Sequence, residues 1–176
     1  MFPKAHAVAY VMMAWRIAWY KVFYPLEYYC AFFSIRASSF NYDTMCFGKE
    51  TLENHMKNIT MKPKDMQTGR ESDTLKDMRI VQEMYARGFE FLPIDLKIAQ
   101  DVNFQIIDGK IMPALSTIEG LGDKAATAIL LATKDGAFLS KDDFKQRTKT
   151  SQTVIDKLSE YGILGDIPQS NQLSFI

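Results

Sequence analysis

Apolar residues crowd the first part of this chain without leaving a polar face. From Pro3 to about Phe23 they occupy nearly every position around a predicted helix, and Pro25 ends that helix and opens a second apolar one, Leu26 to about Ile35. A helix that is apolar on all sides belongs inside a larger structure. We therefore expect a partner, covalent or not, to cover this helical pair; the alternative is that the rest of the chain covers it.

The middle of the chain predicts further helices and a small β element. A helix from Thr44 to about Asn58, with Asp43 as its candidate cap, is followed by an exposed linker at residues 61–70 and a helix from Ser72 to Arg87. The dipeptide Asp108-Gly109 stands between β-prone residues, which is a strong signal for a β-hairpin.

The stretch from Ile118 to Ala126 predicts a glycine turn that leads into a helix. Gly120 and Gly122 allow positive φ and a close approach to the backbone, and Asp123 is a candidate helix cap. Unpaired amides backed by a helix dipole favour an anion such as a phosphate. For a single unit of this kind the commoner alternative is an ordinary turn between helices, with Leu121 filling a core.

A second helix–turn–helix unit follows, with Ser140 and Ser151 as the predicted caps of its two helices and Gly162 as its end. Two such units in tandem can hold both strands of a duplex by their phosphates without reading bases. The Asp123 carboxylate opposes a phosphate at its own position unless it points away. The candidate DNA-binding residues are Gly120, Gly122, Lys124, Lys149, Thr150, Ser151 and Gln152.

The composition of the chain limits the kinds of binding site that it can contain. The 21 basic and 21 acidic residues give no net charge, so nucleic-acid binding must depend on local geometry. Cys30 and Cys46 are too few for a disulfide framework, and with only His6 and His55 we expect no metal site and reduced thiols in a cytoplasmic protein. Charges interrupt the apolar N-terminus, which predicts neither a membrane span nor a signal peptide.

Three motifs resemble the bacterial C-family replicative DNA polymerases. Residues 2–10 (Phe-Pro-Lys-Ala-His-Ala-Val-Ala-Tyr), with Lys21 and Pro25, resemble their fingers segment. The glycine turn with Ala125-Ala126, and then residues 136–147, are similar to their tandem helix-hairpin-helix module. The closing Gln172-Leu173-Ser174 is similar to a sliding-clamp motif, and together these features indicate the PolC type of DNA polymerase III alpha subunit.

The resemblance implies roles for single residues. Lys4 and His6 match a motif near the incoming nucleotide, where they would contact triphosphate oxygens; the alternative is surface charge beside a buried helix. The tail departs from the usual Gln-Leu-Ser-Leu-Phe ending, and it could instead fold back on its own domain. The residues expected to bind the clamp are Gln172, Leu173, Phe175 and Ile176.

The expected fold is mainly α with a small β element. It divides into a helical fingers segment (1–60), a linker, helix and β element (61–110), a tandem helix-hairpin-helix module (111–167) and a clamp-binding tail (168–176). In this family an upstream palm carries the metal-binding aspartates. The resemblance therefore implies a C-terminal polymerase fragment that is inactive alone, with no catalytic residues and no cofactor of its own, Mg²⁺ being implied for the parent polymerase.

The expected partners are double-stranded DNA of any sequence, the sliding clamp, and the palm and thumb of the parent polymerase, with no membrane. Two alternatives stay open. One is a stand-alone, non-catalytic DNA-binding protein that uses the same hairpins, and the other is a helical protein-interaction module in which the glycine turn is only structural.

Overall fold

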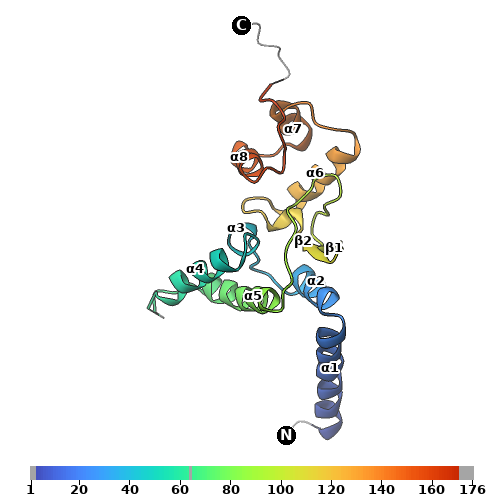
Figure 1. Ribbon diagram of the computed structural model, residues 1–176, viewed down its shortest axis with the longest axis vertical. Coiled ribbons are helices and arrows are strands. Elements are labelled where there is room, and N and C mark those ends of the chain that lie inside the picture. Colours follow the sequence, from blue (N-terminus) through green and yellow to red (C-terminus); the bar gives the residue numbers. More distant parts are fainter. Residues whose placement is uncertain (1–2, 64, 171–176) are drawn as a thin grey trace.

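The apolar N-terminal segment forms two consecutive helices, α1 (Lys4–Phe23) and α2 (Pro25–Ile35), close to the predicted bounds. The computed structural model describes residues 3–63 and 65–170 of the chain and is mainly helical, with one small sheet, as expected (Figure 1). Pro25 occupies the first turn of α2, where its missing N–H is not needed.

The helix expected from Thr44 to Asn58 is split in two. The short α3 (Tyr42–Met45) and α4 (Lys49–Thr60) are separated at Gly48, whose φ of 96° is not compatible with a continuous helix. The cap of α3 is Asn41, whose Oδ1 accepts a hydrogen bond from the Thr44 amide at 3.1 Å. The prediction that Asp43 caps this helix was therefore wrong.

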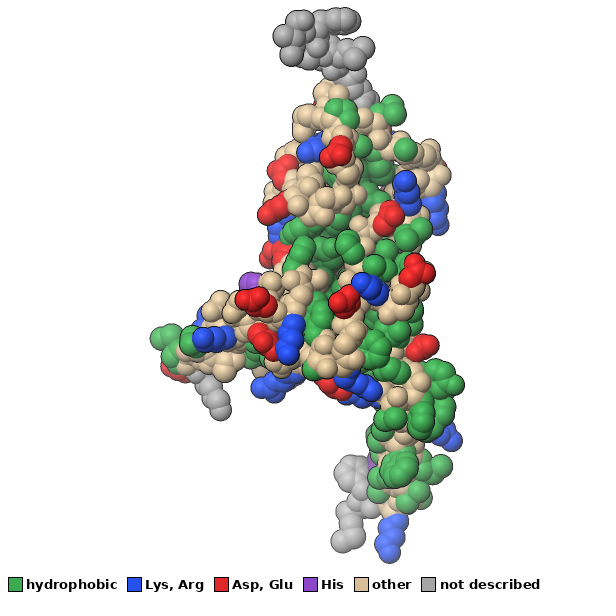
Figure 2. Space-filling view, viewed as in Figure 1, with side chains coloured by type: hydrophobic (Ala, Val, Ile, Leu, Met, Phe, Trp, Pro, Cys, Tyr) green, Lys and Arg blue, Asp and Glu red, His purple; other side chains and the backbone are tan. Residues whose placement is uncertain are grey.

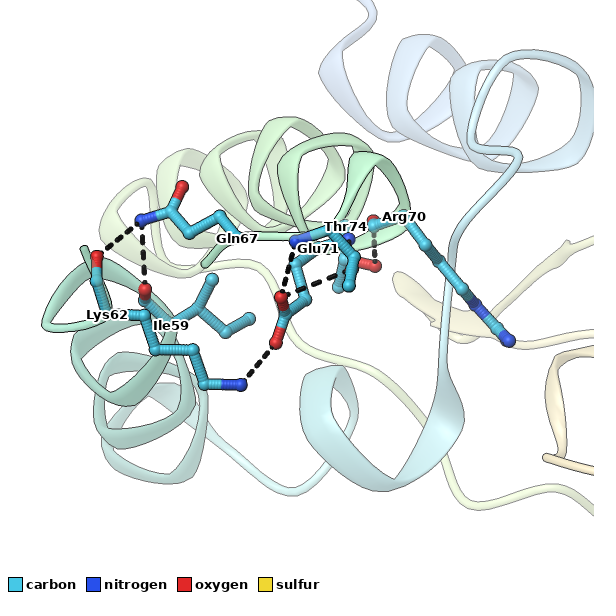
Figure 3. A network of polar contacts seen from close by, with 7 residues as sticks. Ile59, Lys62, Gln67, Arg70, Glu71 and Thr74 are labelled. Atoms are coloured by element: carbon cyan, nitrogen blue, oxygen red, sulfur yellow. Dashed lines mark hydrogen bonds and ion pairs between the residues drawn. The ribbon is translucent and has the colours of Figure 1, made fainter. Parts of the chain in front are cut away.

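Helix α5 (Gly69–Ala86) begins three residues earlier than predicted because a capping box precedes it. The Glu71 carboxylate accepts from the Thr68 amide at 2.9 Å, and the Thr68 hydroxyl accepts from the Glu71 amide at 3.2 Å. Lys62 lies 2.5 Å from the same carboxylate and, with the cap, lowers the pKa of Glu71 to about 2. Figure 3 shows this network, in which the Gln67 amide also bonds two carbonyl oxygens at the end of α4.

The predicted hairpin is present as β1 (Gln105–Ile107) and β2 (Lys110–Met112), which pair antiparallel. Asp108 and Gly109 both have positive φ, 50° and 75°, as a tight two-residue turn requires. A single parallel bridge adds Phe91 beside β2.

The C-terminal part contains the two expected helix–turn–helix units in the expected order. A 3₁₀ turn, η1 (Leu115–Thr117), precedes the glycine turn and α6 (Asp123–Lys134); α7 (Lys141–Thr148) and α8 (Gln152–Glu160) form the second unit. The Ser140 hydroxyl caps α7, as predicted, by accepting from the Asp143 amide at 3.1 Å.

Two hydrophobic cores meet along β2. Ile111 packs in a core formed with α2, α4 and α5, whereas the next residue, Met112, faces a core formed with α6, α7 and α8. Helix α3 is shared in the same way, because Met45 enters the first core and Tyr42 the second. The two cores therefore share elements, and this fixes the position of the glycine turn relative to α4 and α5.

Helix α1 projects from this body and buries none of its side chains (Figure 1). Its apolar residues are open to solvent, and Figure 2 shows them clustered along the projecting helix. Its end is held by an ion pair of 2.6 Å between Lys21 and Glu83 and by a hydrogen bond from Arg87 to the Lys21 carbonyl. The rest of the described chain does not cover α1, and none of the described helices is both long and apolar enough to cross a membrane.

Candidate nucleic-acid interface

The glycine turn exposes its two glycines and buries the residue between them. Gly120 has a φ of 85°, which favours glycine, whereas Gly122 has an ordinary extended conformation with a φ of −75°. Leu121 is 3% exposed and packs in the C-terminal core. The turn therefore does fill a core with Leu121, and it still leaves the Gly120 and Gly122 backbone accessible.

Free backbone donors gather at this turn. The amides of Gly120, Gly122 and Lys124 donate no hydrogen bond within the described residues, and all three residues are exposed. Gly122, and not Asp123 as predicted, is the N-cap of α6, so Asp123 is the first residue of that helix. The positive end of α6 suits an anion, although the exposed Asp123 carboxylate in the first turn opposes one.

In the second turn a lysine takes the conformation that glycine takes in the first. Lys149 has a φ of 57°, is exposed, and makes no ion pair within the described residues. Ser151 is the N-cap of α8 and is exposed, and its hydroxyl makes no capping bond. The turn thus places a cation and a free hydroxyl at the start of a helix.

Two other predicted residues of this turn are already engaged. Thr150 is only 5% exposed, and its hydroxyl lies 2.6 Å from that of Thr148, so its side chain cannot reach a ligand. The exposed Gln152 side chain accepts from Lys145 at 3.1 Å and donates to Asp156 at 2.9 Å. Thr150 is therefore better described as a structural residue of the turn than as a contact residue.

The two turns lie next to each other at the start of α8. A Cβ atom placed on Gly120 would lie 3.5 Å from the Val154 side chain, in the first turn of that helix. One turn further on, Lys157 pairs with Glu119 at 2.5 Å and with Asp43 at 3.7 Å, and the Glu119 hydrogen bond raises the pKa of Lys157. These contacts join the first turn, α8 and α3 into one unit.

Arg147 links the first helix–turn–helix unit to the second, a role that was not predicted from the sequence. Its guanidinium donates to the carbonyl oxygens of Gly136 (3.0 Å), Ala137 (3.2 Å) and Ala132 at the end of α6. It also lies 4.5 Å from the centre of the Phe138 ring. Arg147, on α7, therefore binds both the last turn of α6, at Ala132, and the connector that follows it, at Gly136 and Ala137.

The remaining predicted site residues lie elsewhere. Lys4 and His6 are exposed at the start of α1, at the opposite end of the molecule from α7 and α8 (Figure 1). Gln172, Leu173, Phe175 and Ile176 lie outside the described residues. Within residues 3–63 and 65–170, no group of three or more His, Cys, Asp or Glu side chains could hold a metal ion.

The sequence is similar to known proteins over nearly its whole length. A family model for the helix-hairpin-helix motif matches residues 88–173. DNA polymerase III PolC-type of Streptococcus pyogenes serotype M1 is 45% identical over 175 residues, and that of Caldanaerobacter subterraneus subsp. tengcongensis is 44% identical over 174 residues. Each match covers 99% of this chain and 12% of the relative. The chain is thus a homologue, over nearly its whole length, of one segment of the PolC-type DNA polymerase III proteins.

Proposed function

We propose that this chain is the part of a bacterial replicative DNA polymerase that grips the template–primer duplex. The observation that carries the proposal is the row of free, exposed amides at Gly120, Gly122 and Lys124, next to the second turn. The homology to PolC-type DNA polymerase III supports the same conclusion.

Each turn would hold a phosphate of the duplex backbone. The Gly120 and Gly122 amides donate to phosphate oxygens, and the Lys124 and Lys149 side chains add positive charge. Ser151 and the amide of Gln152 serve the second turn. Because these groups reach phosphates and no base edges, binding is independent of sequence. A chain with no net charge attracts DNA only through such local groups.

The other contacts belong to the whole polymerase. The projecting α1 docks by its apolar surface onto the rest of a PolC-type protein, which carries the palm, the thumb and the Mg²⁺-dependent chemistry, and this places Lys4 and His6 beside the incoming nucleotide. The tail residues Gln172, Leu173, Phe175 and Ile176 tether the assembly to the sliding clamp. Such an assembly works in the cytoplasm.

A salt titration tests the duplex grip. Binding of fluorescent duplexes of unrelated sequence is measured by anisotropy at increasing salt. We expect equal affinities for all sequences, and a logarithm of the binding constant that falls linearly with the logarithm of salt concentration, by about 0.9 per phosphate neutralised. A protein-interaction module would bind none of these duplexes.

Gly122→Val tests the first turn without straining it. Gly122 has a negative φ, and a Cβ placed there meets no atom within 4 Å, so the valine should leave the fold unchanged while blocking close approach of a phosphate. Loss of a hydrogen bond to a charged group should weaken duplex binding about tenfold. Gly69→Val is the matched control, because Gly69 also has open space around it. A folded Gly122→Val protein with undiminished affinity would refute the role of this turn.

A further inference from the structure

A cleft of about 700 Å³ lies between the glycine turn and helices α4 and α5. Residues 116–122, including both glycines, form one wall. The opposite wall consists of residues 38–41 and side chains of α4 and α5, among them His55 and Arg70. Gly120 and Gly122, whose amides donate no hydrogen bond within the described residues, therefore border a defined space.

Among the described residues that line this cleft, Arg70 is the one lysine or arginine. The two carboxylates of the cleft are already neutralised, Glu71 by Lys62 and Glu119 by Lys157, each at 2.5 Å. Arg70 is exposed and forms no ion pair within the described residues, and Figure 3 shows its side chain extending away from the capping network. Arg70 and Glu119 both line the cleft, and the hydrogen bond and charge of Lys157, with a smaller contribution from the Arg70 charge, lower the pKa of Glu119.

Hydroxyl groups line the cleft around Arg70. Those of Ser38 and Ser116, on opposite walls, form no hydrogen bond within the described part of the chain. The neighbouring Ser39 is held in place because its amide donates to the buried Asp77 carboxylate at 2.9 Å. A guanidinium, free hydroxyls and free amides are the groups that proteins use to bind phosphates and sugars of nucleic acids.

We propose that this cleft binds a short single-stranded stretch of DNA that continues from the duplex held by the two turns. Arg70 contacts one of its phosphates bidentately, and Ser38 and Ser116 contact the backbone on either side. The volume is that of a small-ligand pocket, which accommodates a few nucleotides of one strand and no duplex. This inference rests on the proposed duplex grip, because the cleft and the grip share Gly120 and Gly122.

The test compares four DNA ligands and two variants of the full chain. The ligands are a blunt duplex, the same duplex with a 5′ or a 3′ single-stranded extension, and the single strand alone. Arg70→Ala should weaken binding of one extended duplex about tenfold and lower its salt slope by about one, while blunt-duplex affinity stays within about twofold. The matched control is Arg79→Ala, an exposed arginine on the same helix that does not line the cleft, and it should change neither.

The outcomes separate this inference from the duplex grip. Equal losses on blunt and extended duplexes would make Arg70 part of the duplex site and overturn the single-strand assignment, as would identical behaviour of Arg70→Ala and Arg79→Ala. The cleft would instead be a mononucleotide site if a free deoxynucleoside triphosphate displaced the single-stranded extension and if affinity did not depend on the length of that extension. If the blunt duplex does not bind but the single strand binds through Arg70, the duplex grip fails, and of this inference only single-strand binding in the cleft stands. Binding of neither ligand overturns both.

Discussion

Two backbone positions, Gly120 and Lys149, adopt the left-handed conformation at the two turns, with φ values of 85° and 57°. Glycine does so without strain, but a residue with a Cβ atom loses about 1 kcal/mol there. The second turn therefore carries strain that glycine would avoid. What the lysine adds at this position is an exposed positive charge, which suits a phosphate-binding role.

The substitution Lys149→Gly separates that charge from stability. Relief of the left-handed strain is offset by the greater freedom of glycine in the unfolded chain, about 0.4–1 kcal/mol, so the free energy of unfolding should change by less than about 1 kcal/mol. Loss of the cation should reduce the salt slope of duplex binding by about one. Urea denaturation and anisotropy measure the two quantities, and Lys149→Arg should preserve the slope. An unchanged slope in Lys149→Gly would remove Lys149 from the interface.

Residue roles at the turns were only partly predictable from sequence. Positive φ at Gly120 was expected, because an exposed glycine in a turn commonly supplies it. The N-cap of α6 was placed one residue too late, at Asp123 instead of Gly122, since the sequence alone leaves helix ends uncertain by a residue or two. Thr150 is buried and its hydroxyl contacts that of Thr148, and no local sequence pattern predicted this contact.

Between elements, a single arginine connects α6 to α7. Arg147 donates to one carbonyl oxygen in the last turn of α6 and to two in the connector after it. It also lies 3.5 Å from Asp143 on its own helix and stacks on Phe138. Its side chain is 25% exposed, so these bonds are partly shielded from water. The relative position of the two helix–turn–helix units depends on this contact as well as on the shared core.

We expect Arg147→Ala to destabilise the fold. Hydrogen bonds from a charged donor contribute about 1.5–3 kcal/mol, and the variant removes the donor to the Gly136 and Ala137 carbonyl groups, so the free energy of unfolding should fall by about 2 kcal/mol. Urea denaturation measures the loss. Arg79→Ala removes the same charge from an exposed position and should stay within about 0.5 kcal/mol of the wild type. Equal stabilities of the two variants would contradict the connecting role of Arg147.

Elements governed by local signals were predicted well, and those governed by distant contacts were not. The β-hairpin formed where Asp108-Gly109 placed it, because both turn residues suit positive φ. The break at Gly48 was missed because a glycine inside a helical pattern can be tolerated. In the structure, the hydroxyl of Tyr85 on α5 accepts a hydrogen bond from the Gly48 amide and donates one to the Met45 carbonyl, and these two bonds fix the break. The cleft beside Arg70 brings residues 38–41 together with residues 116–122, which are more than 70 positions away along the chain, so the sequence alone could not reveal it.

At the scale of the whole molecule, a well-packed body carries a helix, α1, that buries none of its side chains against the described residues. Both cores lie in the body, whereas α1 exposes eleven large hydrophobic or aromatic side chains, among which Trp15 is 76% exposed, and the adjoining Tyr24 is exposed as well. An exposed apolar surface of this extent is typical of an interaction site. Because the chain spans 12% of its PolC-type relatives, the remainder of such a protein is the partner we propose for α1.

Tryptophan fluorescence reports on that docking directly, because both tryptophans of the chain, Trp15 and Trp19, lie on α1. In the isolated chain at low concentration we expect emission typical of solvent-exposed indole, which hardly changes when urea unfolds the two cores and the far-ultraviolet circular dichroism is lost. Addition of the rest of a PolC-type protein, prepared without this segment, should shift the emission to shorter wavelength as the indoles leave water. Trp15→Glu should weaken that shift by placing a charge in the contact, whereas Arg79→Ala on the body should not. Emission already blue-shifted in the isolated chain, independent of concentration, would show that the chain covers α1 itself, and the docking proposal would then fail.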